Sequence, residues 1–121
     1  MTARLEDTPV LDDEILAEMT GGSGEEVVEA LVEGFLDEVE GRVGAFDQAL
    51  AGDDVNAMGF QAHALKSVSR TYGAMRLGAL AERLEKAARN DDCASVREDA
   101  GSLSEIWRST SAAFRTRFLS G

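Results

Sequence analysis

Residues 27–50 read VVEALVEGFLDEVEGRVGAFDQAL, and this stretch decides the fold. Its apolar residues recur at intervals of three or four, which is the period of one face of an α-helix. No segment of the chain alternates apolar and polar residues with a period of two, as a half-buried strand would. The stretch therefore predicts a long amphipathic helix with the apolar stripe Val28, Val32, Phe35, Val39, Val43, Phe46 and Leu50.

The limits of this helix are marked by cap and stop signals. Ser23 and Glu26 fit an S-x-x-E capping box and predict its start. Gly52 predicts its end, and the acidic pair at 53–54 predicts the N-cap of the next helix. Each internal glycine costs the helix about 1 kcal/mol relative to Ala, a cost we expect packing to offset. These glycines are Gly34, Gly41 and Gly44.

Three more segments carry helical stripes. We expect helices over 54–70, 74–90 and 93–119. Gly73 is the expected C-terminal cap residue of the first, and Gly101 is a candidate for a bend in the last. The stripe of the first consists of Met58, Ala62, Leu65, Ser69 and Tyr72.

A short fifth helix is predicted over residues 11–20, ending at the glycine pair 21–22. Because the connections between the helices are short, neighbouring helices should pack antiparallel. The prediction is an all-α fold in which residues 1–121 form a single domain, an up-down four-helix bundle with a short additional N-terminal helix.

Composition excludes several classes of function. The chain has 121 residues, one His, one Cys and a net charge of −11. One Cys and one His exclude an internal disulfide, a Cys-rich zinc site and a multi-histidine metal site, so we expect no metal. The acidity argues against nucleic-acid binding. No apolar run approaches the roughly 20 residues that cross a bilayer, and no signal segment is visible, so we expect a cytoplasmic protein.

Charge is divided unevenly along the chain. Residues 1–54 hold 16 acidic and two basic residues, whereas residues 55–90 hold six basic and two acidic ones. The single histidine, His63, lies in this basic segment. Such asymmetry is informative about partners, although solvated helix faces with no function give similar clusters.

A helical wheel places the neighbours of His63 on one face. Gly59, Lys66, Ser67 and Arg70 all fall within about 60° of His63, away from the apolar stripe. A neutral imidazole is a nucleophile that forms covalent intermediates. If it took a phosphoryl group, with a charge of about −1.5 to −2, the two cations would offset that charge. An ordinary surface histidine fits the same pattern, so geometry alone leaves the choice open.

The run AHALKSVSRTYGA, residues 62–74, resembles the signature of histidine-containing phosphotransfer (HPt) domains, and residues 77–85 resemble the next helix of that family. The resemblance covers almost the whole chain. It implies a four-helix bundle that carries a phosphoryl group on histidine without ATP and without a cofactor of its own. The implied partners are response-regulator receiver domains, which hold the Mg²⁺ and donate or accept the group, and a hybrid histidine kinase upstream.

The resemblance also assigns roles to single residues. His63 matches the phosphoryl-accepting histidine, Lys66 the neutralising lysine, and Gly73 the glycine that ends the histidine helix. Ser69 stands where the family has a small residue. Ser67 departs from the family's usual Gly, which puts the tightness of receiver docking in doubt.

Glu85 stands where the family commonly has Gln or Glu bonded to the ring nitrogen that does no chemistry. Hairpin geometry supports this independently, because a turn near 71–73 brings residues 63 and 85 within about 4 Å in height. Glu82, one turn away, is the alternative partner of the ring. A purely structural role for Glu85 is also open, as an exposed helix carboxylate paired with Arg89.

Receiver docking is expected on the exposed face of the 54–70 and 74–90 helices. We expect Gly59, Ser67, Ser69, Arg70 and Gly73 to contact the phosphoryl group or the receiver. Two roles are open for the apolar residues of the N-terminal helix, Val10, Leu11 and Ile15: contact with the receiver, or closure of the bundle.

The sequence thus predicts a monomeric phosphorelay intermediate. Two alternatives stay open: a receiver-binding adaptor without phosphoryl chemistry, and the histidine-bearing domain of a chemotaxis-type kinase. An ATP-dependent kinase is disfavoured because a bundle of this length leaves no room for a nucleotide-binding domain.

Overall fold

The computed structural model describes residues 4–119, and these residues form helices but no strand. Two short elements flank the main helices: a 3-10 turn at Leu5–Asp7 and a π-helical turn at Arg115–Leu119. The α-helices are α1 (Asp13–Thr20), α2 (Glu25–Ala51), α3 (Val55–Thr71), α4 (Met75–Arg89), α5 (Cys93–Ala100) and α6 (Leu103–Phe114).

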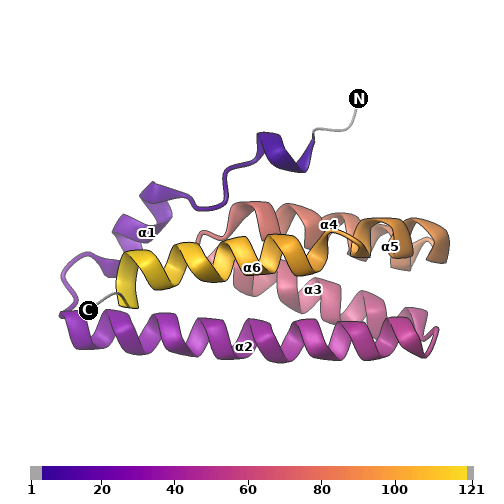
Figure 1. The fold of residues 1–121 in the computed structure, drawn as a ribbon, viewed down its shortest axis with the longest axis horizontal. Helices are drawn as coiled ribbons and strands as arrows, with labels where there is room; N and C mark the ends of the chain where they lie inside the picture. Colours follow the sequence, from indigo (N-terminus) through magenta and orange to yellow (C-terminus); the bar gives the residue numbers. More distant parts are fainter. Residues whose placement is uncertain (1–3, 120–121) are drawn as a thin grey trace.

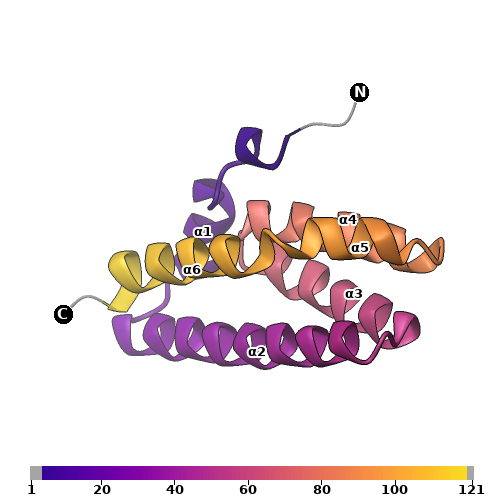
Figure 2. The ribbon, with the colours of Figure 1, turned by 45° about the vertical axis from the view of Figure 1, so that its right-hand side comes forward.

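The long helices run alternately up and down. Helix α2 packs against α3, α3 against α4, and α4 against both α5 and α6, while α6 also contacts α2 (Figure 1). Figure 2 shows the same helices from a second side, with α1 beside the turn that joins α3 to α4. The predicted all-α, up-down bundle with a short N-terminal helix is therefore confirmed.

The core forms where the predicted apolar stripes meet. Phe35 of α2 is fully buried, and its ring centroid lies 4.6 Å from that of Phe114, 4.8 Å from Tyr72 and 6.4 Å from Trp107. Three different segments, α2, the end of α3 and α6, thus meet at one aromatic cluster. Aromatic side chains bury large areas and dominate core energetics, so this cluster fixes the helices around one centre.

The last helix differs from the prediction. Instead of one helix over 93–119, α5 ends at Ala100 and α6 begins at Leu103, with backbone bonds from Gly101 to Glu98 and from Ser102 to Asp99 forming a tight turn.

The capping box at the start of α2 is also wrong. Gly24 is the N-cap, and its carbonyl accepts from the amides of Val27 and Val28 at 3.1 Å without any side-chain cap. Helix α2 therefore starts one residue after a glycine, a residue type that the N-cap position tolerates well.

The start of α3 follows the prediction. Asp54 is its N-cap, and the side chain accepts from the amide of Ala57 at 3.1 Å. This cap fixes where α3 begins, and so sets the position of the helix face that carries His63.

The turn between α3 and α4 is closed from outside by the N-terminal segment. Gly73 occupies the turn with φ of 78°, a conformation that favours glycine, and its carbonyl accepts from the Asp12 amide at 2.8 Å. The Met75 amide, at the start of α4, donates to the Val10 carbonyl at 3.1 Å. The N-terminal segment therefore caps both helices of the hairpin.

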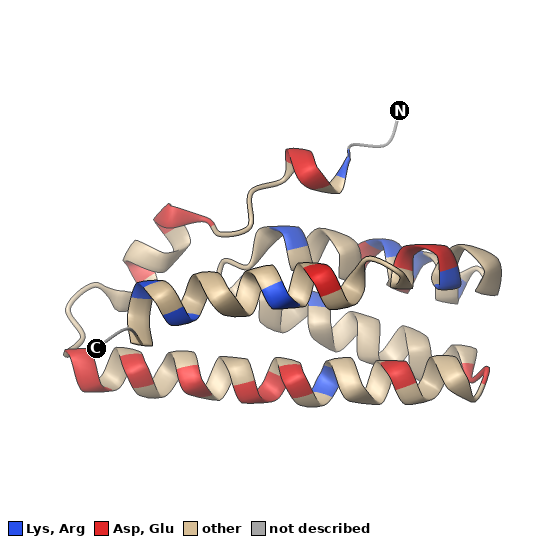
Figure 3. Ribbon diagram, in the orientation of Figure 1, with Lys and Arg blue, Asp and Glu red and all other residues tan. Residues whose placement is uncertain are grey.

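Charge is separated across the bundle. Figure 3 shows acidic residues along α2 and basic residues on α4, which lies on the far side of the bundle from α2. No helix within residues 4–119 is long and apolar enough to cross a membrane.

Candidate phosphoryl-transfer site

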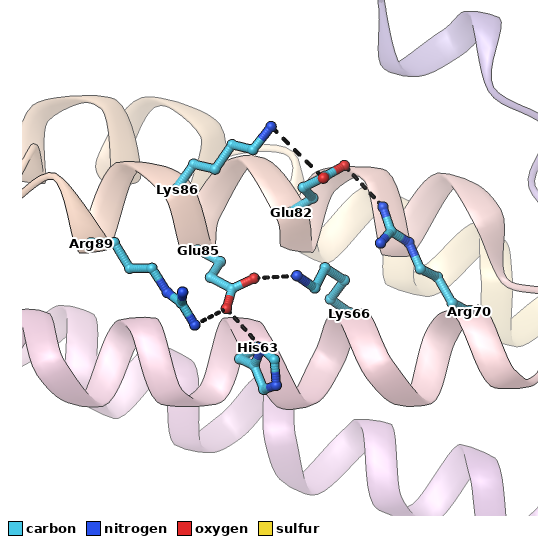
Figure 4. A network of polar contacts seen from close by, with 7 residues as sticks. All are labelled: His63, Lys66, Arg70, Glu82, Glu85, Lys86 and Arg89. Atoms are coloured by element: carbon cyan, nitrogen blue, oxygen red, sulfur yellow. Dashed lines mark hydrogen bonds and ion pairs between the residues drawn. The ribbon is translucent and has the colours of Figure 1, made fainter.

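His63 lies near the middle of α3 and faces α4. Its side chain is 55% exposed, and its Nδ1 lies 2.7 Å from Oε2 of Glu85 on α4 (Figure 4). One ring nitrogen is thus held by a partner. The exposure of the side chain leaves the other nitrogen, Nε2, available to solvent or to another molecule.

Glu85 is the centre of the site. Its side chain is only 4% exposed, yet it contacts three cationic or titratable groups. Oε2 accepts from His63 and lies 2.7 Å from Nη2 of Arg89, and Oε1 lies 2.6 Å from Nζ of Lys66. A buried carboxylate without such partners would be strongly disfavoured.

The surroundings of Glu85 act on its pKa in opposite directions. Burial raises the pKa, but hydrogen bonds from Lys66 and His63, together with the charges of Lys66 and Arg89, outweigh burial and hold it below its usual value. Glu85 is therefore ionised at neutral pH and can only accept a hydrogen bond. Nδ1 of His63 must then carry the proton when the ring is neutral, which leaves the Nε2 lone pair free.

Glu82 takes no part in this pair. Its carboxylate lies 2.9 Å from Nη2 of Arg70 and 3.7 Å from Nζ of Lys86 (Figure 4). Of the two carboxylates that the sequence left open, the structure therefore brings Glu85 to His63. The Glu85–Arg89 pair expected for an exposed Glu85 is present too, but the Glu85 carboxylate is buried.

The structure changes which cations accompany His63. Lys66 reaches Glu85 beside the ring as expected, but Arg70 is turned toward Glu82. Arg89 lies on the opposite side of His63 from Lys66 along the helix pair, as Figure 4 shows. Sequence reasoning missed Arg89 as a site residue, although its i, i+4 spacing from Glu85 was visible.

Two of the expected contact residues are on the surface beside His63. Gly59 packs close to α4, where a Cβ added to it would lie 3.5 Å from the Cβ of Ala88. Ser67 is exposed one turn after His63. Both positions stay compatible with contact to a partner.

Ser69 and Gly73 are corrections. We expected them at the phosphoryl or receiver contact, but both are buried. Ser69 faces the interior between α3 and α4. A Cβ added to Gly78 of α4 would lie 3.6 Å from the Cβ of Ser69. Gly73 lies under α1, since a Cβ there would lie 3.3 Å from Ile15. Both residues serve the packing of the hairpin.

The N-terminal apolar residues close the bundle. Ile15 packs over Gly73, Leu11 packs against the core, and the Val10 carbonyl caps α4. Of the two roles considered for them, closing the bundle is the one that these contacts support.

A shallow hollow opens beside His63. It has a volume of about 260 Å³ and lies between the first turns of α3 and the end of α4. Its lining residues are Val55, Asn56, Gly59, Phe60, His63, Ala88 and Arg89. Phe60 is 66% exposed, one of two large apolar side chains so exposed among residues 4–119, and sequence reasoning missed it.

The described part of the chain offers no metal centre. No three His, Cys, Asp or Glu side chains within residues 4–119 are grouped so that they could hold an ion. The groups present at the site are the imidazole, the buried carboxylate and the two nearby cations.

Comparison with known proteins places this arrangement in a family. The family model described as "Hpt domain" matches residues 30–113. The chain is also similar to the crystal structure of histidine-containing phosphotransfer protein B (HptB) from Pseudomonas aeruginosa PAO1, with a TM-score of 0.82 and 25% sequence identity over 92% of this chain and 96% of that one. No curated protein matches the chain. The chain belongs to the Hpt domain family, the histidine phosphotransfer proteins of phosphorelays.

Proposed function

We propose that His63 carries the phosphoryl group, accepting it from the aspartyl-phosphate of one receiver domain and passing it to another. The observation that carries the proposal is the 2.7 Å contact between Nδ1 and the buried Glu85 carboxylate. This contact holds the ring in one tautomer and directs Nε2 outward. We expect the protein to act as a monomer between a hybrid histidine kinase and a response regulator.

In the proposed step, the Nε2 lone pair attacks phosphorus and a P–N bond forms as the P–O bond to the receiver aspartate breaks. The aspartate leaves as a carboxylate, and the ring, still protonated at Nδ1, gains a positive charge. The ionised Glu85 stabilises that charge at 2.7 Å, as the acid of a catalytic triad stabilises an imidazolium. Return transfer is the same step reversed.

Lys66 and Arg89 are proposed to offset the charge of the phosphoryl group. A phosphorylated side chain carries about −1.5 to −2 charges at pH 7. Both cations lie against Glu85 beside the ring, and Arg89 is largely exposed, so both can exchange a carboxylate oxygen for a phosphoryl oxygen. The Mg²⁺ that shields the group during transfer is expected on the receiver, and positioning with charge stabilisation supplies most of the rate.

The test is incubation of the protein with phosphorylated receiver domains and Mg²⁺. We expect phosphate on the protein that is labile in acid and stable in alkali, and its absence from His63→Gln. Labelling that persists in His63→Gln would show that His63 is not the residue that carries the phosphoryl group. A wild-type protein that binds receivers but is never labelled would be an adaptor instead.

Lys66→Ala provides the second arm of this test. We expect it to slow transfer, because Lys66 acts on the reacting group, and to leave the protein folded with the helical content of the wild type. The unfolding midpoint should fall, because the buried Glu85 carboxylate loses one of its three partners. Loss of the fold in Lys66→Ala would show that the lysine serves only the buried Glu85.

A further inference from the structure

The surface around His63 is polar on one side and apolar on the other. Toward the C-terminal end of α3, the α3–α4 surface carries the Arg70–Glu82 and Lys86–Glu82 ion pairs. Toward the N-terminal end lies the hollow that contains Phe60 and Gly59. A partner that approaches Nε2 therefore meets different chemistry on the two sides.

Phe60 is the apolar feature of the hollow side. It precedes His63 by three residues, one turn of α3, so a molecule in contact with Nε2 is within reach of its ring. The floor beside it is made of small residues, since Gly59 and Ala88 lie close enough for ordinary van der Waals contact. Exposed aromatic side chains next to a small-residue depression are the usual anchors of protein interfaces.

Charge adds to this asymmetry. Arg89 lines the hollow, and Lys66 lies on the far side of the ring, so the entrance to Nε2 is flanked by cations. The partner required by the proposed function must bring an acidic phosphorylation pocket to this point. The cations match that pocket, and the hollow matches an apolar side chain beside it.

We propose that the receiver docks off-centre, over the first turns of α3 and the end of α4, with Phe60 as its apolar anchor. This inference rests on the proposed function and adds the orientation of the partner. It commits to a receiver domain that carries an exposed apolar side chain next to its acidic pocket. The N-terminal helix lies outside the footprint, because its apolar residues already pack over Gly73 and the core.

The first experiment compares two phosphoryl donors. Transfer from a phosphorylated receiver requires docking, whereas phosphoramidate, a small donor, phosphorylates histidine without a protein partner. For each variant, the receiver rate is divided by the phosphoramidate rate, so that the ratio reports docking. Phe60→Ala should lower this ratio at least about tenfold, because truncating an interface anchor typically costs that much or more.

Two further variants sharpen the comparison. Phe60→Leu keeps an apolar side chain and should stay within about threefold of the wild type. Val27→Ala is the matched control, since Val27 is 53% exposed but lies at the start of α2, and its ratio should not change. A ratio for Phe60→Ala within twofold of the wild type, or an equal loss in Val27→Ala, would overturn the proposal.

The second experiment locates the footprint directly. Amide NMR signals are recorded while an unphosphorylated receiver is added to the full chain. Shifts should cluster at residues 55–63 and 88–89, and a cluster at residues 10–15 would overturn the off-centre orientation. If no receiver labels wild-type His63, the proposed function itself fails, whereas labelling without a Phe60 effect defeats only this inference.

Discussion

At the scale of single residues, Glu85 shows how a charge becomes tolerable inside a bundle. Its carboxylate is almost fully buried, and its two oxygens are shared among His63, Lys66 and Arg89. These partners come from both helices of the hairpin, so the carboxylate also ties α3 to α4. Removing any one partner leaves buried charge less well compensated, which is costly.

The lowered pKa of Glu85 gives stability a pH dependence of known sign. A carboxyl group whose pKa falls on folding stabilises the protein above its unfolded-state pKa, and the contribution is lost as pH falls through the folded-state pKa. Glu85→Gln should therefore flatten the acid limb of the unfolding free energy below about pH 4.5, measured by urea unfolding at a series of pH values.

Glu82→Gln is the control for this measurement, because it removes a carboxylate from the same helix one turn away. Subtracting its pH profile leaves the part that belongs to the buried site. An identical flattening in both variants would contradict the special position of Glu85.

Ser69 offers a second prediction. Its Oγ is buried and has no hydrogen-bond partner among the described residues. An unpartnered buried hydroxyl costs about 1 kcal/mol or more, so Ser69→Ala should stabilise the fold by roughly that amount and leave phosphotransfer intact. Ser67→Ala, at an exposed position, should shift the urea midpoint little. Destabilisation by Ser69→Ala would show that the hydroxyl is satisfied after all.

The candidate site was partly predictable from the sequence. Helix spacing and hairpin register narrowed the partner of His63 to Glu85 or Glu82, because both follow from regular helix geometry, and the structure decides for Glu85. The stripe of α3 already placed Ser69 in the core, and only the family resemblance moved it to the surface. Phe60 could not be found, because the exposure of one apolar side chain depends on which neighbours fail to cover it.

At the scale of the helix, α2 contains glycines that no packing requires. A Cβ added at Gly34, Gly41 or Gly44 would meet nothing within 4 Å. Each Gly→Ala replacement should stabilise the protein by about 0.5–1 kcal/mol, because alanine loses less backbone freedom on folding. Thermal unfolding of the three single variants measures the gain.

Gly73→Ala is the contrasting variant. Its φ of 78° is strained for alanine, and the new Cβ would press on Ile15 and Asp12 at 3.3 Å. We expect a lower melting temperature for this variant. A gain at Gly73, or losses at all three α2 positions, would contradict the assignment of which glycines the fold needs.

The break between α5 and α6 shows what periodicity does not resolve. The apolar stripe steps from Ala100 to Leu103, an interval that suits both a continuous helix and a three-residue turn. Glycine in α2 stays helical, while Gly101 lies in a turn, so residue type alone does not decide. The bundle was predictable because either version leaves the same residues facing the core.

At the scale of the whole molecule, the N-terminal segment stabilises a hairpin some 60 residues away. Nε of Arg76 donates to the Thr8 carbonyl at 2.8 Å, and its Nη2 donates to the Glu6 carbonyl at 3.2 Å. Arg76→Gln should loosen the segment and raise hydrogen exchange of the Met75 amide by about tenfold, because a charge-assisted hydrogen bond contributes about 1.5 kcal/mol or more.

Amides in the middle of α2, such as that of Val39, are the internal reference, and they should exchange as in the wild type. Equal acceleration at Val39 would indicate global destabilisation, and unchanged exchange at Met75 would show that Arg76 does not hold the segment.

The separation of charge across the bundle has a consequence for encounters in solution. Helix α2 holds eight acidic residues and one Arg, and the opposite hairpin is basic (Figure 3). The molecule therefore has a large electric dipole in addition to its net charge of −11. In the field of an acidic body, the net charge is repelled while the dipole exerts a torque that turns the basic side forward. At physiological salt these forces act over a Debye length of roughly 8 Å. Within that distance, rotation of the protein relative to its acidic partner, rather than attraction between the two, selects which encounters become productive.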